Sequence, residues 1–267
     1  MLNIRNESFK TLDEVKKLAP SIFTTTAAEN VSSHYTHIPT SRVIEDMTTL
    51  GWGIVDAKEV KARKGIGYQK HLVVFRNPEI SITGNDGDVV YPQILLTNSH
   101  DGKNAFTFTA GLFRMVCENG LIISSDKFED VKMRHMGYTF EELQSNIHDM
   151  VERLPLTVDA MNTMKQTILD QEQMIEFAKQ AISSRFNDDE LDTLNIDITE
   201  LLTPTRTEDA GSDLWSVFNI VQEKMIHGGF QYTNNNNKTR KARRIKNFNQ
   251  DINVNKALFE TALSFAN

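Results

Sequence analysis

The sequence predicts an α+β protein, with an antiparallel sheet and packed helices in the N-terminal half and a mainly helical C-terminal half. Residues 52–135 contain short runs of β-branched and aromatic residues separated by turn residues such as Asn85-Asp86-Gly87. After Gly137, apolar residues instead recur at the spacing of one helix face. We therefore expect an N-terminal arm over 1–36, an α+β sheet core over 37–136 and a mainly helical region over 137–267.

Two short helices are expected before the sheet. Leu12–Leu18 has helical spacing and is stopped by Pro20, and Thr24–Ala28 is expected to be an irregular, mobile arm. A second helix is expected over Ser41–Leu50, where apolar residues recur at helical spacing and Gly51 follows as a stop signal.

The strands of the sheet core follow as short runs. The expected strands are 52–62, 68–76, 80–82, 89–97, 105–109, 121–123 and 131–135. Pro92 cannot donate a ladder hydrogen bond, so its strand is expected at an edge of the sheet, or with a bulge. Between Gly111 and Gly120, Leu112 and Val116 recur at helical spacing, which predicts a short helix that ends at the second glycine.

Helices and polar segments are expected to alternate in the C-terminal half. Residues 140–182 have helical spacing with a break or kink near Pro155, and further helices are expected over 214–226 and 252–265. The acidic stretch 188–213 is expected to be a linker. The stretch 234–246 opens with four asparagines, continues with basic residues, and is expected to be an exposed, mobile loop.

Composition excludes several classes of protein. The chain has 267 residues, of which 39% are hydrophobic, and no apolar run approaches the roughly 20 residues that span a bilayer. The first residues lack the apolar segment of a secretory signal, and the single cysteine, Cys117, excludes an internal disulfide. We therefore expect a cytoplasmic protein with Cys117 buried as a small hydrophobe. Neither a Gly-rich phosphate loop nor a metal-binding motif occurs, so we expect no cofactor and no metal.

Charge is distributed unevenly along the chain. The net charge is −7, but residues 58–76 carry six Lys/Arg against one acid, and residues 238–246 carry six Lys/Arg and no acid. Residues 137–213 hold 17 Asp/Glu against five Lys/Arg. Local basic patches, with flat side chains between them, are typical of proteins that bind single-stranded nucleic acid. The candidate nucleic-acid-binding residues are Lys58, Lys61, Arg63, Lys64, Tyr68, Lys70, Arg76, Lys238, Arg240, Lys241, Arg243, Arg244 and Lys246. Tyr68, together with His71, is expected to stack on bases.

A second candidate site is polar and centres on the turn at Asp101-Gly102. Its members are Asn98, His100, Asp101, Arg114 and His135. Three interpretations stay open: a tight turn held by its own side chains, a binding site, or a catalytic or metal centre. No spacing among these residues matches a motif for a nucleophile or a metal.

Several blocks of the chain together resemble a known family. They include Thr97-Asn98-Ser99-His100-Asp101-Gly102, Leu112–Leu121, Arg134-His135, Leu214–Asn219 and Asn255–Phe259. The resemblance covers roughly residues 35–265 and is to phage, plasmid and prophage proteins catalogued as a domain of unknown function (number 932). It implies a mobile-element protein acting inside a bacterial cell. The order of helix, three strands and further helix also resembles the core of single-strand annealing recombinases, which implies DNA binding along a basic groove.

Three functions follow as hypotheses. The first is a DNA-binding protein that prefers single strands, with strand annealing in phage recombination or replication as its role, and assembled as a homo-oligomer. The second is an accessory or anti-defence factor that contacts a host or phage protein through the acidic helical half. The third is a hydrolase or metal enzyme built around His100, Asp101 and His135.

Overall fold

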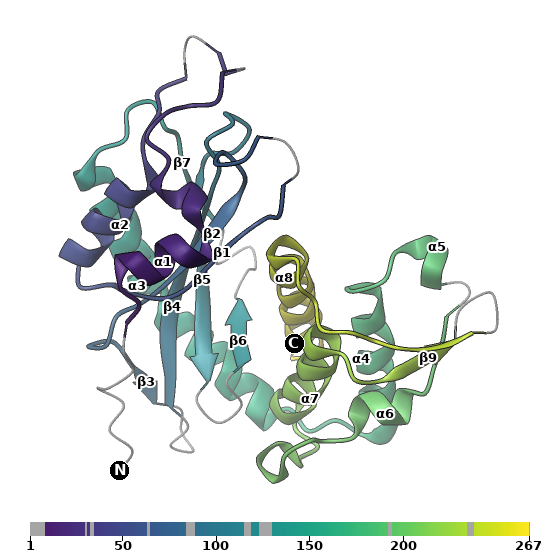
Figure 1. Cartoon of the computed structure of the whole chain (residues 1–267). Helices are drawn as coiled ribbons and strands as arrows, with labels where there is room; N and C mark the ends of the chain where they lie inside the picture. The colour runs from purple at the N-terminus through teal and green to yellow at the C-terminus, as the bar shows by residue number, and fades with distance from the viewer. Residues whose placement is uncertain are drawn as a thin grey trace. The chain divides into compact units, whose positions relative to one another are not determined.

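The computed structural model describes residues 9–29, 31–32, 35–62, 65–83, 89–114, 119–122, 130–191, 194–233 and 238–266 (Figure 1). These residues form two compact units. Described residues up to 114 and 130–154 belong to the first unit, and 119–122 and 155–266 belong to the second. Within these ranges, the helices are all too short or too polar to cross a membrane. Cys117 lies outside the described residues.

The first unit is built on an antiparallel sheet, as the sequence predicts. Its strands are β1 (Gly53–Glu59), β2 (His71–Arg76), β3 (Ile82–Thr83), β4 (Val89–Asn98), β5 (Phe106–Arg114) and β7 (Val131–Met133). The central order is β1-β2-β4-β5, with β3 beside β4 and β7 beside β5. Each of these pairs runs antiparallel. The predicted α+β class is therefore confirmed.

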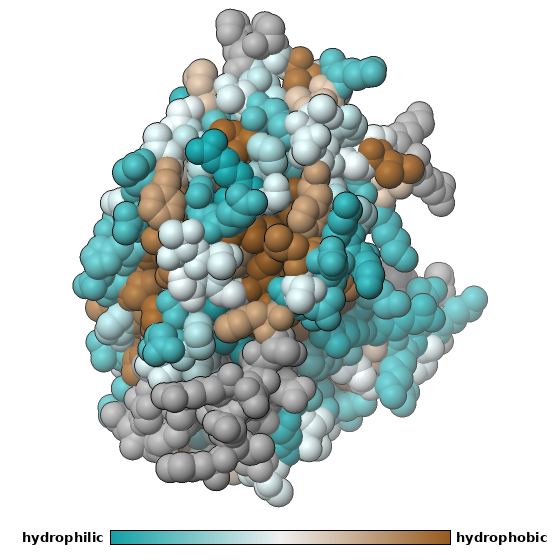
Figure 2. Space-filling model, turned by 60° about the vertical axis from the view of Figure 1, so that its left-hand side comes forward, coloured by the Kyte–Doolittle hydropathy of each residue, from teal (hydrophilic) through white to brown (hydrophobic). Residues whose placement is uncertain are grey.

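Helices bury one face of this sheet. They are α1 (Leu12–Leu18), the 3-10 helix η2 (Pro20–Phe23), α2 (Thr40–Thr49) and the first turns of α3 (Phe140–Gln166). The shared core joins helix residues such as Val15, Ile44 and Leu143 to Phe75 and Phe108 of the sheet. Part of the N-terminal segment, predicted as an arm, therefore lies in the core. Figure 2 shows hydrophobic side chains in the middle of one face with hydrophilic ones around them.

Two expectations about the sheet are wrong. Gly111–Arg114 continues strand β5 instead of starting a helix, and 115–118 lie outside the described residues. A short apolar run fits both the period of a helix and that of a strand, and pairing with β4 makes this run a strand. Pro92 lies inside the sheet, because β5 pairs with β4 on one side. On its other side β2 reaches only Gln93 and β3 only Val90, so Pro92 faces the break between those two strands.

The second unit is mainly helical with a small sheet. Its elements are β6 (Asn119–Ile122), the later turns of α3, α4 (Gln171–Ser183), α5 (Asp188–Leu191), β8 (Asn195–Ile196), α6 (Ile198–Leu202), the 3-10 helix η3 (Thr207–Asp209), α7 (Leu214–His227), β9 (Gln231–Thr233), β10 (Thr239–Lys241) and α8 (Phe248–Phe265). Helices α4, α7 and α8 contact one another. Phe218 of α7 meets Phe259 of α8 edge to face, with ring centroids 6.4 Å apart. The small sheet has the order β10-β9-β8.

The acidic stretch 188–213 is folded, which corrects the predicted linker. It contains α5, β8, α6 and η3, and three of its acids have a clear role in the local structure. Asp197 accepts a hydrogen bond from Thr199 N and caps α6, and Asp213 caps α7 in the same way. Arg206 forms ion pairs with Asp209 and Glu223, with N–O distances of 3.3 and 3.1 Å.

The sequence predicts a break or a kink near Pro155, and the break between the helices lies farther along the chain. Pro155 is inside α3, which continues to Gln166. The chain leaves the helix after that residue, and Asp170 starts α4 through a capping box with Gln173. Side-chain capping at Asp170, and not the proline, therefore separates the two helices.

Candidate nucleic-acid interface

The described part of the basic stretch, residues 238–246, is held in place and is called the basic segment below. It begins in β10, which pairs with β9. Beyond the strand, Ala242 N donates to Phe230 O at 2.8 Å, and Ile245 N donates to Ile226 O at 2.9 Å. Ala242 and Ile245 are buried. The predicted mobile loop is therefore wrong for residues 238–246, and 234–237 lie outside the described residues.

A glycine after α7 allows the basic segment to approach. Gly228 has a φ of +72°, a conformation that side chains with a Cβ rarely adopt. A Cβ at this position would lie 2.5 Å from Ala242 O. Gly228 therefore both ends α7 and leaves room for the backbone of the basic segment.

Arg185, just after α4, also holds the basic segment in place. Its guanidinium donates hydrogen bonds to the carbonyl oxygens of Met225 in α7 and Arg243. The guanidinium also lies 5.8 Å from the ring centre of Phe186 and 5.6 Å from that of Phe230. Burial lowers the pKa of Arg185. These contacts rigidify the segment and keep a cation beside two rings.

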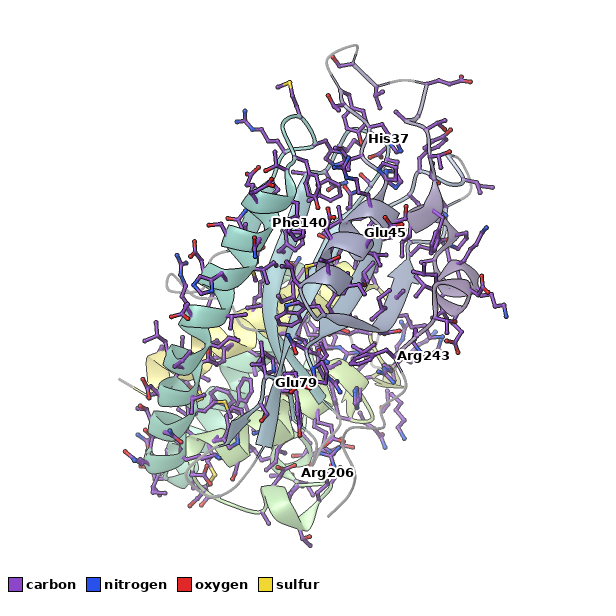
Figure 3. All side chains as sticks on the ribbon, turned by 90° about the vertical axis from the view of Figure 1, so that its left-hand side faces the viewer. His37, Glu45, Glu79, Phe140, Arg206 and Arg243 are labelled. Carbon is purple, nitrogen blue, oxygen red and sulfur yellow. The ribbon has the colours of Figure 1, made fainter. Side chains whose placement is uncertain are left out.

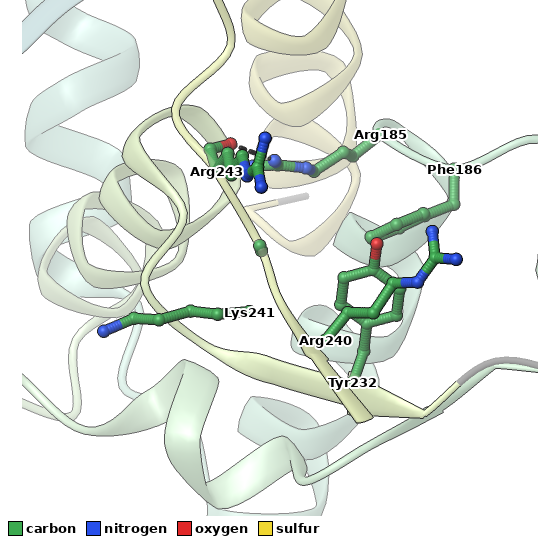
Figure 4. A pocket seen from close by; sticks show the side chains of 7 residues that line it. Arg185, Phe186, Tyr232, Arg240, Lys241 and Arg243 are labelled. Carbon is green, nitrogen blue, oxygen red and sulfur yellow. Dashed lines mark hydrogen bonds between the residues drawn. The ribbon is translucent and has the colours of Figure 1, made fainter. Parts of the chain in front are cut away.

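These residues enclose an open cleft of about 770 Å³ on the second unit (Figure 4). It is lined by Arg185, Phe186, Tyr232, Arg240, Lys241, Ala242 and Arg243. Tyr232 and Arg240 are paired across β9 and β10 and share one face, whereas Lys241 points to the other side. The rings of Tyr232 and Phe186 meet edge to face, with centroids 5.5 Å apart. Cations and half-buried aromatic rings therefore line the same cavity.

The cations of the basic segment lie at the surface of the second unit. Lys238, Arg240, Lys241, Arg243, Arg244 and Lys246 are all exposed. Across the described ranges, no carboxylate forms an ion pair with Arg240, Lys241, Arg243, Arg244 or Lys246. The buried Ala242 and Ile245 lie between these exposed residues and anchor the backbone that carries them. Six cations predicted from the sequence are thus brought together.

The other predicted basic stretch, 58–76, is not brought together as one cationic track. Lys61 is exposed, but Lys58 forms a 3.0 Å ion pair with Asp56. Lys70 is half-buried, and burial lowers its pKa. Arg76 is buried on β2, with its guanidinium 5.9 Å from the ring centre of Tyr91. Arg63 and Lys64 lie outside the described residues.

The two aromatic candidates of this stretch differ. Tyr68 is half-buried, with its hydroxyl 3.4 Å from Thr26 Oγ1. His71 has no exposed surface, so the expectation that it stacks on bases is wrong. It lies instead in a chain of buried polar groups in the first unit.

That chain of polar groups has a definite direction. A carbonyl oxygen only accepts, so His71 Nδ1, 3.1 Å from Gln69 O, carries the proton and Nε2 accepts from the Thr40 hydroxyl at 2.8 Å. Thr40 Oγ1 then accepts from Asn98 Nδ2 at 2.9 Å. Asn98 Oδ1 accepts from His135 Nε2 at 2.9 Å. The other ring nitrogen of His135, Nδ1, accepts from the Tyr35 hydroxyl at 2.9 Å.

Every group in this chain of hydrogen bonds is neutral. A second proton on His71 or His135 would require the Thr40 or Tyr35 hydroxyl to rotate and accept from the ring instead of donating to it. Burial lowers the pKa of His71 to about 4, of His100 to about 3 and of His135 to about 4. His37 lies beside the cluster, with its ring centre 4.8 Å from that of His100 (Figure 3). Four of the seven histidines thus lie together, three of them buried and His37 partly exposed. These rings and the Tyr35, Thr40 and Asn98 side chains bonded to them are called the histidine network.

The polar candidate site divides into an interior and a surface part. Asn98, His100 and His135 belong to the histidine network, whereas Asp101 lies in the following turn. There Asp101 accepts from the Ser99 hydroxyl at 2.6 Å and from Lys103 N at 3.2 Å, as in a turn held by its own side chains. Arg114 ends β5, and its side chain is not described. The Ser99 hydroxyl thus donates to a carboxylate and not to a histidine.

Metal ligation has little support in this arrangement. The described residues include no group of three or more His, Cys, Asp or Glu side chains placed to hold a metal ion. His71 and His100 also lack exposed surface through which a substrate could reach them.

The sequence did not predict several residues of the cleft and of the histidine network. Arg185, Phe186 and Tyr232 were not predicted for the cleft, although Phe230 and Tyr232 alternate with polar residues before the asparagine run, a hairpin signal. Thr40 and Tyr35 were not predicted for the histidine network. No local pattern marks them, because their partners come from distant parts of the chain.

Comparison with known proteins gives a family and two relatives. The model of the family described as "Domain of unknown function (DUF932)" matches residues 27–259. "UPF0380 protein YfjQ" of Escherichia coli (strain K12) is 27% identical over 261 residues, or 97% of this chain and 92% of that protein. "UPF0380 protein YafZ" of the same strain is 28% identical over the same shares. No solved structure matches the chain.

Proposed function

The chain belongs to the DUF932 family, and we propose that this member binds DNA, with a preference for single strands, through the cleft of its second unit. The observation that carries the proposal is the lining of that cleft. Arg240, Lys241 and Arg243 line it together with the rings of Tyr232 and Phe186, and Arg240 is the cation that extends past these rings. A cationic track supplies affinity for phosphates, and ring faces accept bases of any sequence.

Protection of a sheet edge is the simpler explanation for some of these cations. β10 is an edge strand, and lysines or arginines on an edge prevent pairing with other chains. That explanation covers Arg240 and Lys241, which lie within the strand. It does not cover Arg243, Arg244 and Lys246, which follow it and are held outward by buried neighbours. A ligand-binding role accounts for all five.

The test compares a labelled single-stranded oligonucleotide with its duplex over a series of salt concentrations. A quadruple variant replaces Arg240, Lys241, Arg243 and Arg244 with Ala. For a single strand each lost phosphate contact removes about 0.7 from the slope of log affinity against log salt, so a slope shallower by up to about 3 is expected.

A matched variant controls for net charge. It replaces four exposed lysines that do not line the cleft with Ala, namely Lys16, Lys17, Lys132 and Lys179. We expect its affinity and salt dependence to stay near those of the wild type. Equal losses in both variants, or no binding of DNA by the wild type at low salt, would contradict the proposal.

Strand annealing, a homo-oligomeric assembly and a phage or plasmid setting remain predictions from the resemblance. Annealing requires binding first, so an annealing assay with complementary oligonucleotides follows a positive binding result. The protein-binding hypothesis finds fewer free acids than the sequence implied, since Asp197 and Asp213 cap helices and Asp209 is paired with Arg206.

A further inference from the structure

We infer that the cleft accepts one unstacked base of the bound strand, and that Tyr232 and Phe186 form the platform against which this base packs. The inference rests on the proposed function and specifies its site. It transfers the stacking role from Tyr68 in the first unit, where the sequence placed it, to a tyrosine in the second unit.

The two rings are held as a platform. Tyr232 lies on β9 and is fixed by pairing on both sides, with β10 and with β8. Phe186 follows α4, and its ring meets Tyr232 edge to face at 5.5 Å. Both side chains are half-buried, so each ring has one part packed and one part open. Fixed rings lose little conformational freedom when a base packs on them.

Cations lie around the platform, with the Arg185 guanidinium 5.8 Å from the ring centre of Phe186. Arg240 lies directly across the hairpin from Tyr232 and extends past the rings, and Arg243 lies farther along the same segment (Figure 4). The Arg185 guanidinium already donates to two backbone carbonyls. It therefore contributes positive electrostatic potential to the cleft more than direct contacts with a ligand. A base on the rings would therefore have cations within reach of its flanking phosphates.

This arrangement selects the single strand. In a duplex both faces of each base are covered by its neighbours in the stack, and exposing one costs a few kcal/mol. A single strand presents its bases at much lower cost. The cleft, at about 770 Å³, lies within the roughly 300–1,000 Å³ range of small-ligand pockets and can enclose a single base.

Tyr232 provides the test, with Tyr68 as the matched control. Tyr232→Leu removes the ring and keeps an apolar side chain, Tyr232→Phe keeps the ring, and Tyr68→Leu makes the same change in the first unit. Each variant is titrated with a single-stranded oligonucleotide carrying 2-aminopurine, a base whose fluorescence reports its stacking, and with a duplex of the same length. Thermal melting of each variant shows that the fold is kept.

We expect Tyr232→Leu to weaken single-strand binding roughly tenfold or more and to reduce the fluorescence change. Duplex binding should change much less, and Tyr232→Phe and Tyr68→Leu should resemble the wild type. Equal weakening of both forms, no weakening, or an effect confined to Tyr68→Leu would overturn the inference. Failure of the proposed function looks different, because the quadruple Arg/Lys variant would then bind as the wild type does.

Discussion

Mild acid should destabilise the first unit, because its histidine network is built from neutral rings. In the folded chain burial lowers the pKa of His71 from 6.5 to about 4. Between these two values the unfolded chain binds a proton that the folded chain does not. The contribution of the neutral ring to the free energy of unfolding is therefore fully present above about pH 6.5 and is lost progressively as the pH falls toward about 4.

The size of the effect follows from the same values. For a histidine that shifts from 6.5 to about 4, lowering the pH from about 7.5 to about 5 costs about 2 kcal/mol. His100 and His135 are shifted in the same direction by burial, to about 3 and about 4. We expect a loss between about 2 kcal/mol, for His71 alone, and about 6 kcal/mol, for all three rings. Carboxylates of ordinary pKa, about 4, stay mostly ionised over this range.

Urea unfolding at the two pH values measures the loss. Each unit holds one tryptophan, Trp52 in the first and Trp215 in the second, so Trp215→Phe leaves a fluorescence signal from the first unit alone. In that background, His71→Gln should remove one titrating group. The slope of the free energy of unfolding against pH should then fall by up to about 1.4 kcal/mol per pH unit. His148→Gln, at an exposed position on α3, is the matched control.

Two results would refute this reasoning. The first is a free energy of unfolding that is the same at both pH values. The second is an equal effect of His71→Gln and His148→Gln on the pH dependence. Because His71→Gln also disturbs the ring's hydrogen bonds with Ser21, Gln69 and Thr40, ring-nitrogen NMR of the wild type gives an independent check. The buried rings should stay neutral at a pH where exposed histidines have become charged.

Three further predictions concern the second unit. Gly228→Ala should destabilise it more than Gly229→Ala, because both have positive φ but only Gly228 faces a backbone oxygen at 2.5 Å; equal urea unfolding curves would contradict this. Arg206→Ala should cost about 1–3 kcal/mol by removing the cation that pairs with the buried Asp209, and adding Asp209→Asn should restore part of the loss, again in urea unfolding. Arg185→Ala should speed hydrogen exchange at the amides of the basic segment, and unchanged exchange would show that the segment is held without it.

The sequence predicts an element well where the signals are local. Thr11 and Pro20 bound α1, and Gly228 ends α7, because caps and stops act through neighbouring residues. The strand at Gly111–Arg114 was missed because its pairing with β4 is a distant contact. The folded stretch 188–213 was missed because its acidity suggested solvent exposure, although Asp197 and Asp213 are placed as helix caps.

The candidate site follows the same division. Runs of Lys and Arg are visible in a sequence, so the cations of the basic segment were predicted. Their fixed placement was not, since it depends on Arg185 and Gly228, which precede the segment by many residues. The histidine network was half predicted: Asn98, His100 and His135 were named. Thr40, which links them to His71, comes from another element.

A chain of net charge −7 can bind a polyanion if its cations dominate over short distances. At physiological ionic strength the Debye length is about 8 Å, so exposed acids farther away are largely screened from a bound phosphate. In the acidic stretch, Asp197 and Asp213 are engaged as helix caps and Asp209 in an ion pair. Lower salt restores long-range repulsion by the net charge and also strengthens the local attraction. Contacts close to phosphate should dominate this competition, so affinity should rise as salt falls, with a slope set by the cations of the basic segment and not by the net charge.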